Sequence, residues 1–205
     1  SLEEFVGETA SLDYNKYSKE NQTKTGEAAA AAENALSALE EGTLTEEALE
    51  AAGALADEAR TLLAVSEIQI TQDKPEAMKA AAVVTSPADS AGAGASVSVT
   101  VSDIEAGYLF AGLAVSGADG QAVETEEITE NVPEGTRQFR FEMPAGAVTV
   151  AASFEADKSA IADAAAQADG KLEGAYTEES WKALEAALEN AAAVEADPDA
   201  GKADV

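Results

Sequence analysis

The chain has 205 residues, with 40 acidic and 12 basic side chains, a formal net charge of −28, and neither histidine nor cysteine. This charge excludes nucleic acids and anionic membranes as partners, because both are bound through clustered lysine and arginine. Without histidine and cysteine the chain has no Ser-His-Asp triad, thiol nucleophile, disulfide or histidine-based metal site. No run of about 18 apolar residues predicts a membrane-spanning helix.

The first segment, residues 1–65, is rich in Ala, Glu and Leu at helical spacing and predicts three helices. The first helix begins at Leu2. Ser18 is the predicted N-cap of the second helix, Gly42 closes that helix, and Thr45 caps the third. The predicted buried face of the third helix comprises Leu49, Ala52, Ala56, Ala59 and Leu63. Three helices with short connections favour an antiparallel bundle.

The middle segment, residues 67–155, holds most of the Val, Thr, Ser, Gly and Pro. Strict alternation of apolar and polar residues predicts strands at 96–102, 138–143 and 147–154. Weaker patterns predict strands at Ala80–Thr85, Tyr108–Val115 and Gln121–Thr125. Turns are predicted at Asp119–Gly120 and at 143–146. The glycine-rich stretch 91–95 is predicted to be a flexible connection between strands. We expect a small antiparallel β domain, β-grasp-like or sandwich-like.

The last segment, residues 157–205, returns to Ala and Glu and resembles the first segment. Tyr176 and Thr177 stand 159 positions after Tyr17 and Ser18, and Ile161 stands where Leu2 stood. An internal repeat explains this correspondence, and the second copy is expected to stop at the start of its third helix. The predicted architecture is therefore α+β, with a helical bundle at 1–65, a β domain at 67–155 and a partial helical bundle at 157–205.

Carboxylates are the only catalytic groups that this composition offers in number. Glu46/Glu47 and Glu178/Glu179 fall in predicted first helical turns, where they interact favourably with the helix dipole. The segment 127–135 gathers further acids in a predicted loop, without fixing them at a working distance. The segment 196–201 resembles part of a calcium loop, but it lacks the later acids and closing Glu, so a turn between helices is favoured. We predict no enzymatic activity, no metal site and no cofactor.

Two aromatic features allow a binding site as an alternative to a structural role. Tyr108 and Phe110 lie at i, i+2 and so share one face of a predicted strand, where they either pack inward or form a platform for a ligand. Trp181, the single tryptophan, lies at the fourth position of a helix capped by Thr177. Tyr176 then precedes the cap, so the two rings are expected to form a hydrophobic staple.

The predicted stripe that follows Trp181 consists of Leu184, Leu188 and Ala191. Residues 176–181 (Tyr-Thr-Glu-Glu-Ser-Trp), this stripe and the Asp-Pro-Asp-Ala turn at 197–200 together give the last segment a pattern that resembles a FIVAR module. Residues 1–65 are similar but degenerate, with Gln22 where the tryptophan is expected. The resemblance implies a three-helix bundle.

The middle segment resembles the divergent internalin B-repeat-like modules of bacterial surface proteins. The residues that carry this resemblance are Gly107–Gly112, the Asp119–Gly120 turn, and the run Phe141–Val150 (Phe-Glu-Met-Pro-Ala-Gly-Ala-Val-Thr-Val), followed by Phe154. Both resemblances imply a large exported protein of a Gram-positive-type bacterium, secreted or attached to the cell wall. Such modules flank extracellular glycoside hydrolase domains or form adhesins, and no catalytic residues are associated with them.

The resulting hypothesis is a non-catalytic spacer or stalk that presents neighbouring domains at the surface of a cell. The alternative is an accessory module that binds glycans or a host surface protein through Tyr108 and Phe110 or through the acidic segment 127–135. We expect a monomer, with pairing through the C-terminal helices as the other possibility. The expected junctions between segments are short and stiff, at Val65–Ser66 and Glu155–Ala156.

Overall fold

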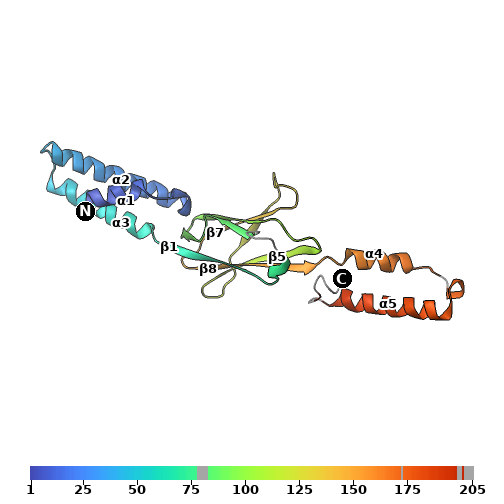
Figure 1. The fold of residues 1–205 in the computed structure, drawn as a ribbon. Helices are drawn as coiled ribbons and strands as arrows, with labels where there is room; N and C mark the ends of the chain where they lie inside the picture. Colours follow the sequence, from blue (N-terminus) through green and yellow to red (C-terminus); the bar gives the residue numbers. More distant parts are fainter. Residues whose placement is uncertain (78–82, 172, 198–199, 201–205) are drawn as a thin grey trace. The chain divides into compact units, whose positions relative to one another are not determined.

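The computed structural model describes residues 1–77, 83–171, 173–197 and 200. Three helices are followed by two four-stranded sheets and then by two further helices, which confirms the predicted α+β class (Figure 1). By compactness the chain divides into two units. The first comprises Ser1–Thr71, Val83–Val101 and Ala114–Val150, and the second comprises the described parts of Gln72–Ala82, Ser102–Leu113 and Ala151–Val205. Because these boundaries run through the β segment, the predicted division into three domains stays a prediction.

The N-terminal bundle consists of α1 (Leu2–Ala10), α2 (Lys19–Glu40) and α3 (Glu46–Leu62), with a 3₁₀ turn η1 (Tyr14–Lys16) between α1 and α2. The predicted caps are confirmed. Ser18 Oγ accepts a hydrogen bond from Asn21 N at 3.1 Å, and Thr45 Oγ1 accepts one from Ala48 N at 3.2 Å. Gly42 ends α2 with φ of +69°, a left-handed conformation that favours glycine.

The core of the bundle surrounds one aromatic side chain, Phe5, which is fully buried among alanines of α2 and α3. Alanine lets the helices approach closely, so a single large side chain fills the remaining space. Arg60 covers the outer face of this ring, with its guanidinium carbon 5.3 Å from the ring centroid. Arg60 Nε also donates to Glu8 Oε2 at 3.2 Å. The cation therefore closes the core from the solvent side.

The predicted buried face of α3 is confirmed only in part. Ala52, Ala56 and Ala59 are buried, but Leu49 is 46% exposed, so its predicted burial is wrong. The reason is the length of α1, which has nine residues against 22 in α2 and 17 in α3. At 1.5 Å per residue, α1 extends along less than half of α2 and leaves Leu49 uncovered.

The strands form two sheets, as expected of the sandwich-like alternative. One sheet has the order β3-β1-β8-β5 and the other β2-β4-β7-β6. The first sheet consists of β1 (Val65–Gln72), β3 (Ser90–Gly92), β5 (Tyr108–Gly117) and β8 (Val148–Ala156). The second consists of β2 (Val83–Ser86), β4 (Ser96–Val101), β6 (Thr125–Ile128) and β7 (Arg137–Glu142). We call residues 65–156 the β module.

The three strongly alternating strands are confirmed with their predicted inward faces. In β4 and β7 the pairs Val97–Phe141 and Val99–Phe139 are directly opposite each other in an antiparallel ladder. The residues that β4, β7 and β8 bury are Val97, Val99, Val101, Phe139, Phe141, Val148, Val150, Ala152, Phe154 and Ala156, and Met143, directly after β7, is buried as well. Both predicted turns are also present, since Gly120 has φ of +77° and Gly146 N donates to Pro144 O at 2.9 Å.

The weaker strand predictions had mixed outcomes. The strand at Tyr108–Val115 is confirmed as β5, whereas in the predicted strand 121–125 residues 121–124 hold only an isolated bridge at Ala122 and Thr125 begins β6. The strand β6 lies further on, at Thr125–Ile128, and takes in part of the predicted acidic loop. The strand predicted at Ala80–Thr85 begins at Val83 among the described residues, and 78–82 lie outside them. The pattern analysis missed β1 and β3 altogether.

The bundle is fastened to the β module by side-chain contacts within the first unit. Only two residues separate α3 from β1, and Lys16 Nζ donates to Ser90 Oγ at 3.0 Å. The ring of Tyr17, 8% exposed, lies so close to Gly92 that a Cβ on that residue would be 3.0 Å from Tyr17 Cδ1. Burial, and then the charge of Asp13, raises the pKa of the Tyr17 hydroxyl above its ordinary value. The stretch 91–95, predicted as a flexible connection, is therefore packed against the bundle.

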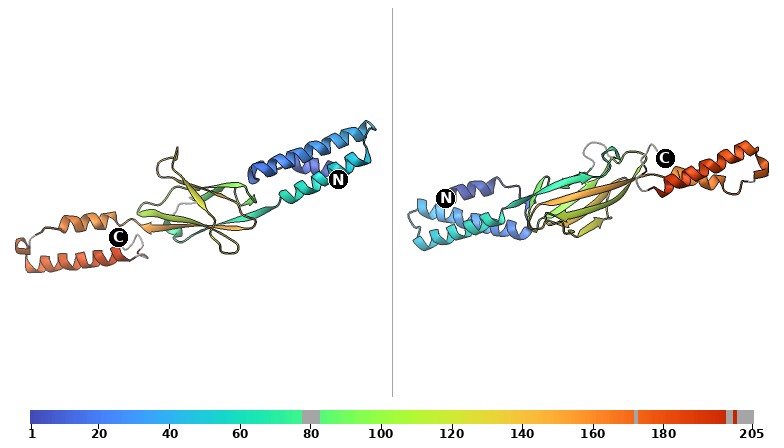
Figure 2. Two further views of the ribbon diagram at one scale, coloured as in Figure 1. Left: turned by 180° about the vertical axis from the view of Figure 1, so that it is seen from behind. Right: turned by 90° about the horizontal axis from the view of Figure 1, so that it is seen from below.

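The C-terminal helices form a hairpin of α4 (Ser159–Ala168) and α5 (Glu178–Ala196), with a 3₁₀ turn η3 (Glu173–Ala175) between them. All views show α4 and α5 side by side (Figure 2). Lys158 Nζ donates to Glu195 O in the last turn of α5 and to Asp197 O of its C-cap. A cation at a helix C-terminus interacts favourably with the dipole.

The apolar stripe of α5 is less buried than its spacing predicts. Trp181, Leu184, Leu188 and Ala191 share the inward face of the helix, but α4 and α5 contain no buried residue. Two helices cover each other from one side only, so the stripe stays half-buried. The predicted end of the second copy falls on residues 201–205, which lie outside the described residues.

Candidate functional site

Several acidic side chains are bound in surface ion pairs or lie in the first turns of helices. Glu46/Glu47 and Glu178/Glu179 occupy the first turns of α3 and α5, as predicted. In β6, Glu126 accepts from Arg140 at 2.6 Å, and Glu127 accepts from Arg137 at 2.8 Å. These pairs bridge neighbouring strands at an exposed surface, where they contribute little to stability. The prediction that segment 127–135 is wholly a loop is therefore wrong at Glu127 and Ile128.

Within the described residues, no group of three or more acidic side chains is arranged to hold an ion. The predicted turn at 196–201 includes Pro198, Asp199 and Gly201, which lie outside the described residues.

Tyr108 and Phe110, the proposed aromatic platform, lie at the start of β5 on the same face. Both side chains are half-buried. The ring of Phe110 packs edge-on against Phe154, with centroids 5.9 Å apart, and Phe154 is itself 2% exposed. Leu109 points to the opposite face and is 46% exposed. Phe110 therefore contributes to the core of the β module, and Tyr108 lies at its margin.

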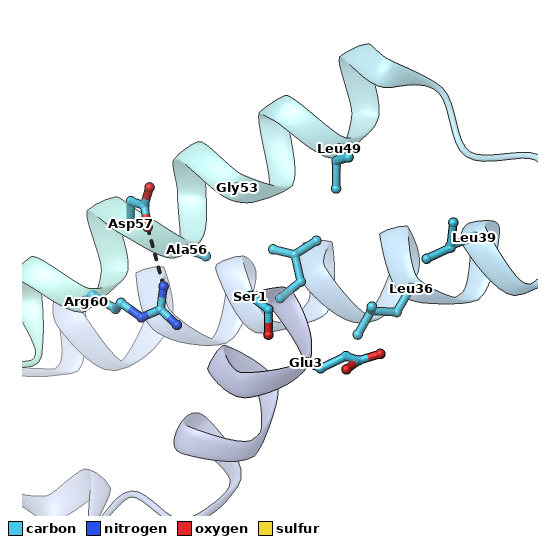
Figure 3. A pocket seen from close by; sticks show the side chains of 10 residues that line it. Ser1, Glu3, Leu36, Leu39, Leu49, Gly53, Ala56, Asp57 and Arg60 are labelled. Carbon is cyan, nitrogen blue, oxygen red and sulfur yellow. Dashed lines mark hydrogen bonds and ion pairs between the residues drawn. The ribbon is translucent and has the colours of Figure 1, made fainter.

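An apolar groove runs along the bundle where α1 does not cover the other two helices (Figure 3). It has a volume of about 490 Å³. Leu36 and Leu39 of α2 face Leu49 of α3 across the groove, and Glu3 and the Asp57–Arg60 ion pair border it. The groove was not predicted from the sequence, because the spacing of Leu49 placed it on the buried face of the third helix. The short first helical segment was the available signal.

A hollow larger than this groove surrounds Trp181, at the turn between η3 and α5. It measures about 600 Å³ and is lined by Glu173, Gly174, Tyr176, Glu178, Trp181, Lys182 and Glu185. The rings of Tyr176 and Trp181 have centroids 6.0 Å apart and an interplanar angle of 36°. Thr177 Oγ1 accepts from Ser180 N at 3.2 Å, so the predicted cap and hydrophobic staple are both confirmed.

The staple does not close the hollow. Tyr176 remains 43% exposed, and Trp181 Nε1 donates to Glu185 Oε1 at 3.0 Å. On the other side Lys182 Nζ binds Glu178 Oε1 at 2.8 Å. Two aromatic faces therefore lie beside three carboxylates and one ammonium group. The sequence predicted the contact between the rings, but not that the pair borders an open hollow.

Comparison of the chain with protein-family models, curated proteins and solved structures gave no match. The resemblances to FIVAR and internalin B-repeat-like modules therefore stay predictions. In the described part of the chain, no helix combines the length and apolar character needed to cross a membrane.

Proposed function

We propose that the chain is a non-catalytic spacer of a bacterial cell-surface or secreted protein, which presents neighbouring catalytic or adhesive domains. The single observation that carries the proposal is the fastening of the bundle to the β module. A spacer holds its neighbouring domains at a defined distance only if its own parts are rigidly connected. Domains within one chain move relative to each other by default, unless contacts at their interface fix them. The assignment to a cell surface rests on the family resemblance alone.

The first junction lies at Leu63–Ala64, because the predicted junction Val65–Ser66 falls inside β1, and it has the contacts that such a role requires. The two residues between α3 and β1 leave little freedom for a hinge, and Lys16 and Tyr17 add contacts to β3 from a second point of the bundle. Attachment at two separate points opposes both bending and twisting. This arrangement supports a stiff connection.

The second junction lies in the other unit, at Asp157–Lys158, because the predicted junction Glu155–Ala156 falls inside β8; it is also short. Two residues separate β8 from α4, and Asp157 N donates to Gly107 O at 2.9 Å. Asp157 Oδ1 accepts from Ser159 N at 3.0 Å. Hydrogen bonds from the Ser159 hydroxyl and backbone N–H lower the pKa of Asp157 below its ordinary value. The carboxylate thus links the end of β8 to the start of α4.

The internal repeat adds support, because spacers are commonly built from repeated units. The turns η1 (Tyr14–Lys16) and η3 (Glu173–Ala175) stand 159 residues apart, and so do the N-caps Ser18 and Thr177. Both caps accept a hydrogen bond from the N–H three residues on. The two helical segments therefore share local geometry as well as sequence.

Backbone ¹⁵N relaxation of the intact chain tests the stiffness of the first junction. We expect the amides of α1–α3 and of β4 and β7 to report one rotational correlation time. In Lys16→Met, which removes the hydrogen bond to Ser90, the bundle should reorient faster. Lys19→Met is the matched control, since Lys19 also begins the α2 region but makes no described contact with β3. Separate correlation times in the unmodified chain would contradict a spacer.

Small-angle X-ray scattering of the same protein tests the spacer role as a whole. An extended particle, whose length grows as further modules are added, is the expected result. A compact particle with its modules folded on one another would refute the proposal. Retention of the chain on a glycan array, lost in Tyr108→Ala while the fold is kept, would favour the alternative binding function.

A further inference from the structure

The turn between η3 and α5 has a counterpart in the first repeat, and that counterpart is a docking surface. Tyr17 occupies the position of Tyr176, 159 residues earlier. Tyr17 is 8% exposed because it packs against Gly92 of the β module, whereas Tyr176 is 43% exposed. The turn with its tyrosine therefore contacts the β module in the first repeat, whereas the tyrosine of the second repeat is exposed to solvent.

The charge of the turn differs between the two copies. Residues 14–26 contain three lysines and one glutamate, a net charge of +2, whereas the equivalent residues 173–185 contain one lysine and four glutamates, a net charge of −3. The β module has 14 acidic and four basic residues, a net charge of −10, and it is contacted by Lys16 of the first turn through Ser90 Oγ. The first turn is thus opposite in net charge to the module that it contacts.

The reversed charge selects a different partner for the second turn. A β module of the kind in this chain would be repelled by the glutamates around Tyr176, so a second copy of the chain does not fit. A basic partner is complementary in charge. The hollow offers such a partner a specific feature, since the faces of Tyr176 and Trp181 attract a cation and Glu173 lies beside them.

We propose that the hollow formed by Glu173, Tyr176, Glu178, Trp181 and Glu185 is a docking site for a basic protein segment, which inserts an arginine side chain between the aromatic pair and the carboxylates. Among the described residues that line the hollow Lys182 is the one base, and it is paired with Glu178. The positive end of the α5 dipole is offset by Glu178 and Glu179 in the first turn. This site would exist whether or not the chain acts as a spacer.

Trp181 reports directly on the site, because it is the only tryptophan of the chain. The intact protein is titrated with the blocked peptide acetyl-Gly-Arg-Gly-amide while tryptophan emission is recorded. We expect a saturable change with a Kd on the order of millimolar, as suits one side chain at a partly exposed site. The same peptide with citrulline, the uncharged isostere of arginine, should cause no saturable change.

Two double variants distinguish binding in the hollow from attraction of the peptide by the overall negative charge of the chain. Glu173→Gln with Glu185→Gln removes two charges from the hollow and keeps the hydrogen-bond acceptor for Trp181 Nε1. This variant should bind the arginine peptide roughly threefold to tenfold more weakly. Glu189→Gln with Glu195→Gln removes the same charge from α5 outside the hollow and should leave binding unchanged. Neither variant alters an apolar side chain, so the hairpin is expected to fold.

Several results would overturn the inference. They are equal binding of the citrulline peptide, equal weakening by both double variants, or no saturable response to the arginine peptide at tens of millimolar. A response to a neutral oligosaccharide such as chitotriose, without one to the arginine peptide, would identify a glycan platform instead. None of these outcomes changes the expected relaxation behaviour of the first junction, so the two proposals fail separately.

Discussion

The contact between Gly92 and Tyr17 gives the sharpest test of how the bundle is attached. A Cβ added at Gly92 would lie 3.0 Å from Tyr17 Cδ1, 3.2 Å from Ala64 O and 3.4 Å from Lys16 O. Two of these three atoms are backbone carbonyls, and Ala64 is held between α3 and β1. In Gly92→Ala the methyl group can be accommodated only if the Tyr17 ring and the two carbonyl oxygens shift away from it.

The expected cost follows from this geometry. Inserting a methyl group into a packed contact typically destabilises a protein by about 1–3 kcal/mol. A contact of 3.0 Å between carbon atoms is too short and raises the cost of the substitution. Rotation of the tyrosine ring away from the methyl group lowers that cost. We therefore expect a loss of about 1–2 kcal/mol in the free energy of unfolding of the first unit. The larger effect should be local, with Tyr17 released from the β module.

Urea unfolding measures the free energy of global unfolding. Hydrogen exchange of the amides in η1 and β3 measures the free energy of local opening at the contact. Gly53→Ala in α3 is the matched control, because a Cβ there meets no atom within 4 Å. That substitution should stabilise the protein by about 0.5–1 kcal/mol, since alanine is the better helix former. Unchanged stability and unchanged exchange in Gly92→Ala would refute the close contact and, with it, the fastening of the bundle.

Three further predictions concern other parts of the chain. Phe5→Ala should lower the unfolding free energy of the bundle by about 3–5 kcal/mol in urea titrations, because it empties the core under Arg60, and a loss below about 1 kcal/mol would contradict a core centred on that ring. Thr45→Ala should cost about 1 kcal/mol through loss of the α3 cap, whereas Thr45→Ser should be nearly neutral; equal losses in the two variants would show that the hydroxyl is not the cap. For Asp157, the lowered pKa means that its contribution to stability is present above the unfolded value of about 3.9 and is lost as pH falls through the lower folded value. The side-chain carboxyl chemical shift should titrate below pH 3.9, and a midpoint at or above that value would count against the hydrogen bonds from Ser159.

Local signals predicted the helices and the strongest strands well. Ser18, Thr45 and Thr177 all cap the helices that they were predicted to cap, because a cap depends on only a few consecutive residues. The alternating strands β4, β7 and β8 were also found, since their period alone places Val and Phe on one face. The contact between Tyr176 and Trp181 followed from their spacing around Thr177.

Prediction failed where the structure depends on residues distant in sequence. Strand β1 alternates weakly and buries only Ile68, so its pairing with β3 decides its conformation. Strand β6 carries two consecutive glutamates, a pattern that favours a loop, but Arg140 and Arg137 on the neighbouring strand bind them. The exposure of Leu49 depends on the length of α1, and the packing of Gly92 depends on Tyr17, 75 residues before it.

The helix–strand–helix order of the three segments, the strongly alternating strands, the repeat at an offset of 159 and the acidic character of the chain all follow from the sequence alone. These properties depend on composition and on short-range periodicity, which a single chain displays directly. The fold is what buries the tyrosine of one repeat against the β module and leaves that of the other at the border of an open hollow. The two residues have the same local geometry, and the difference arises because burial depends on which distant surface lies opposite each ring.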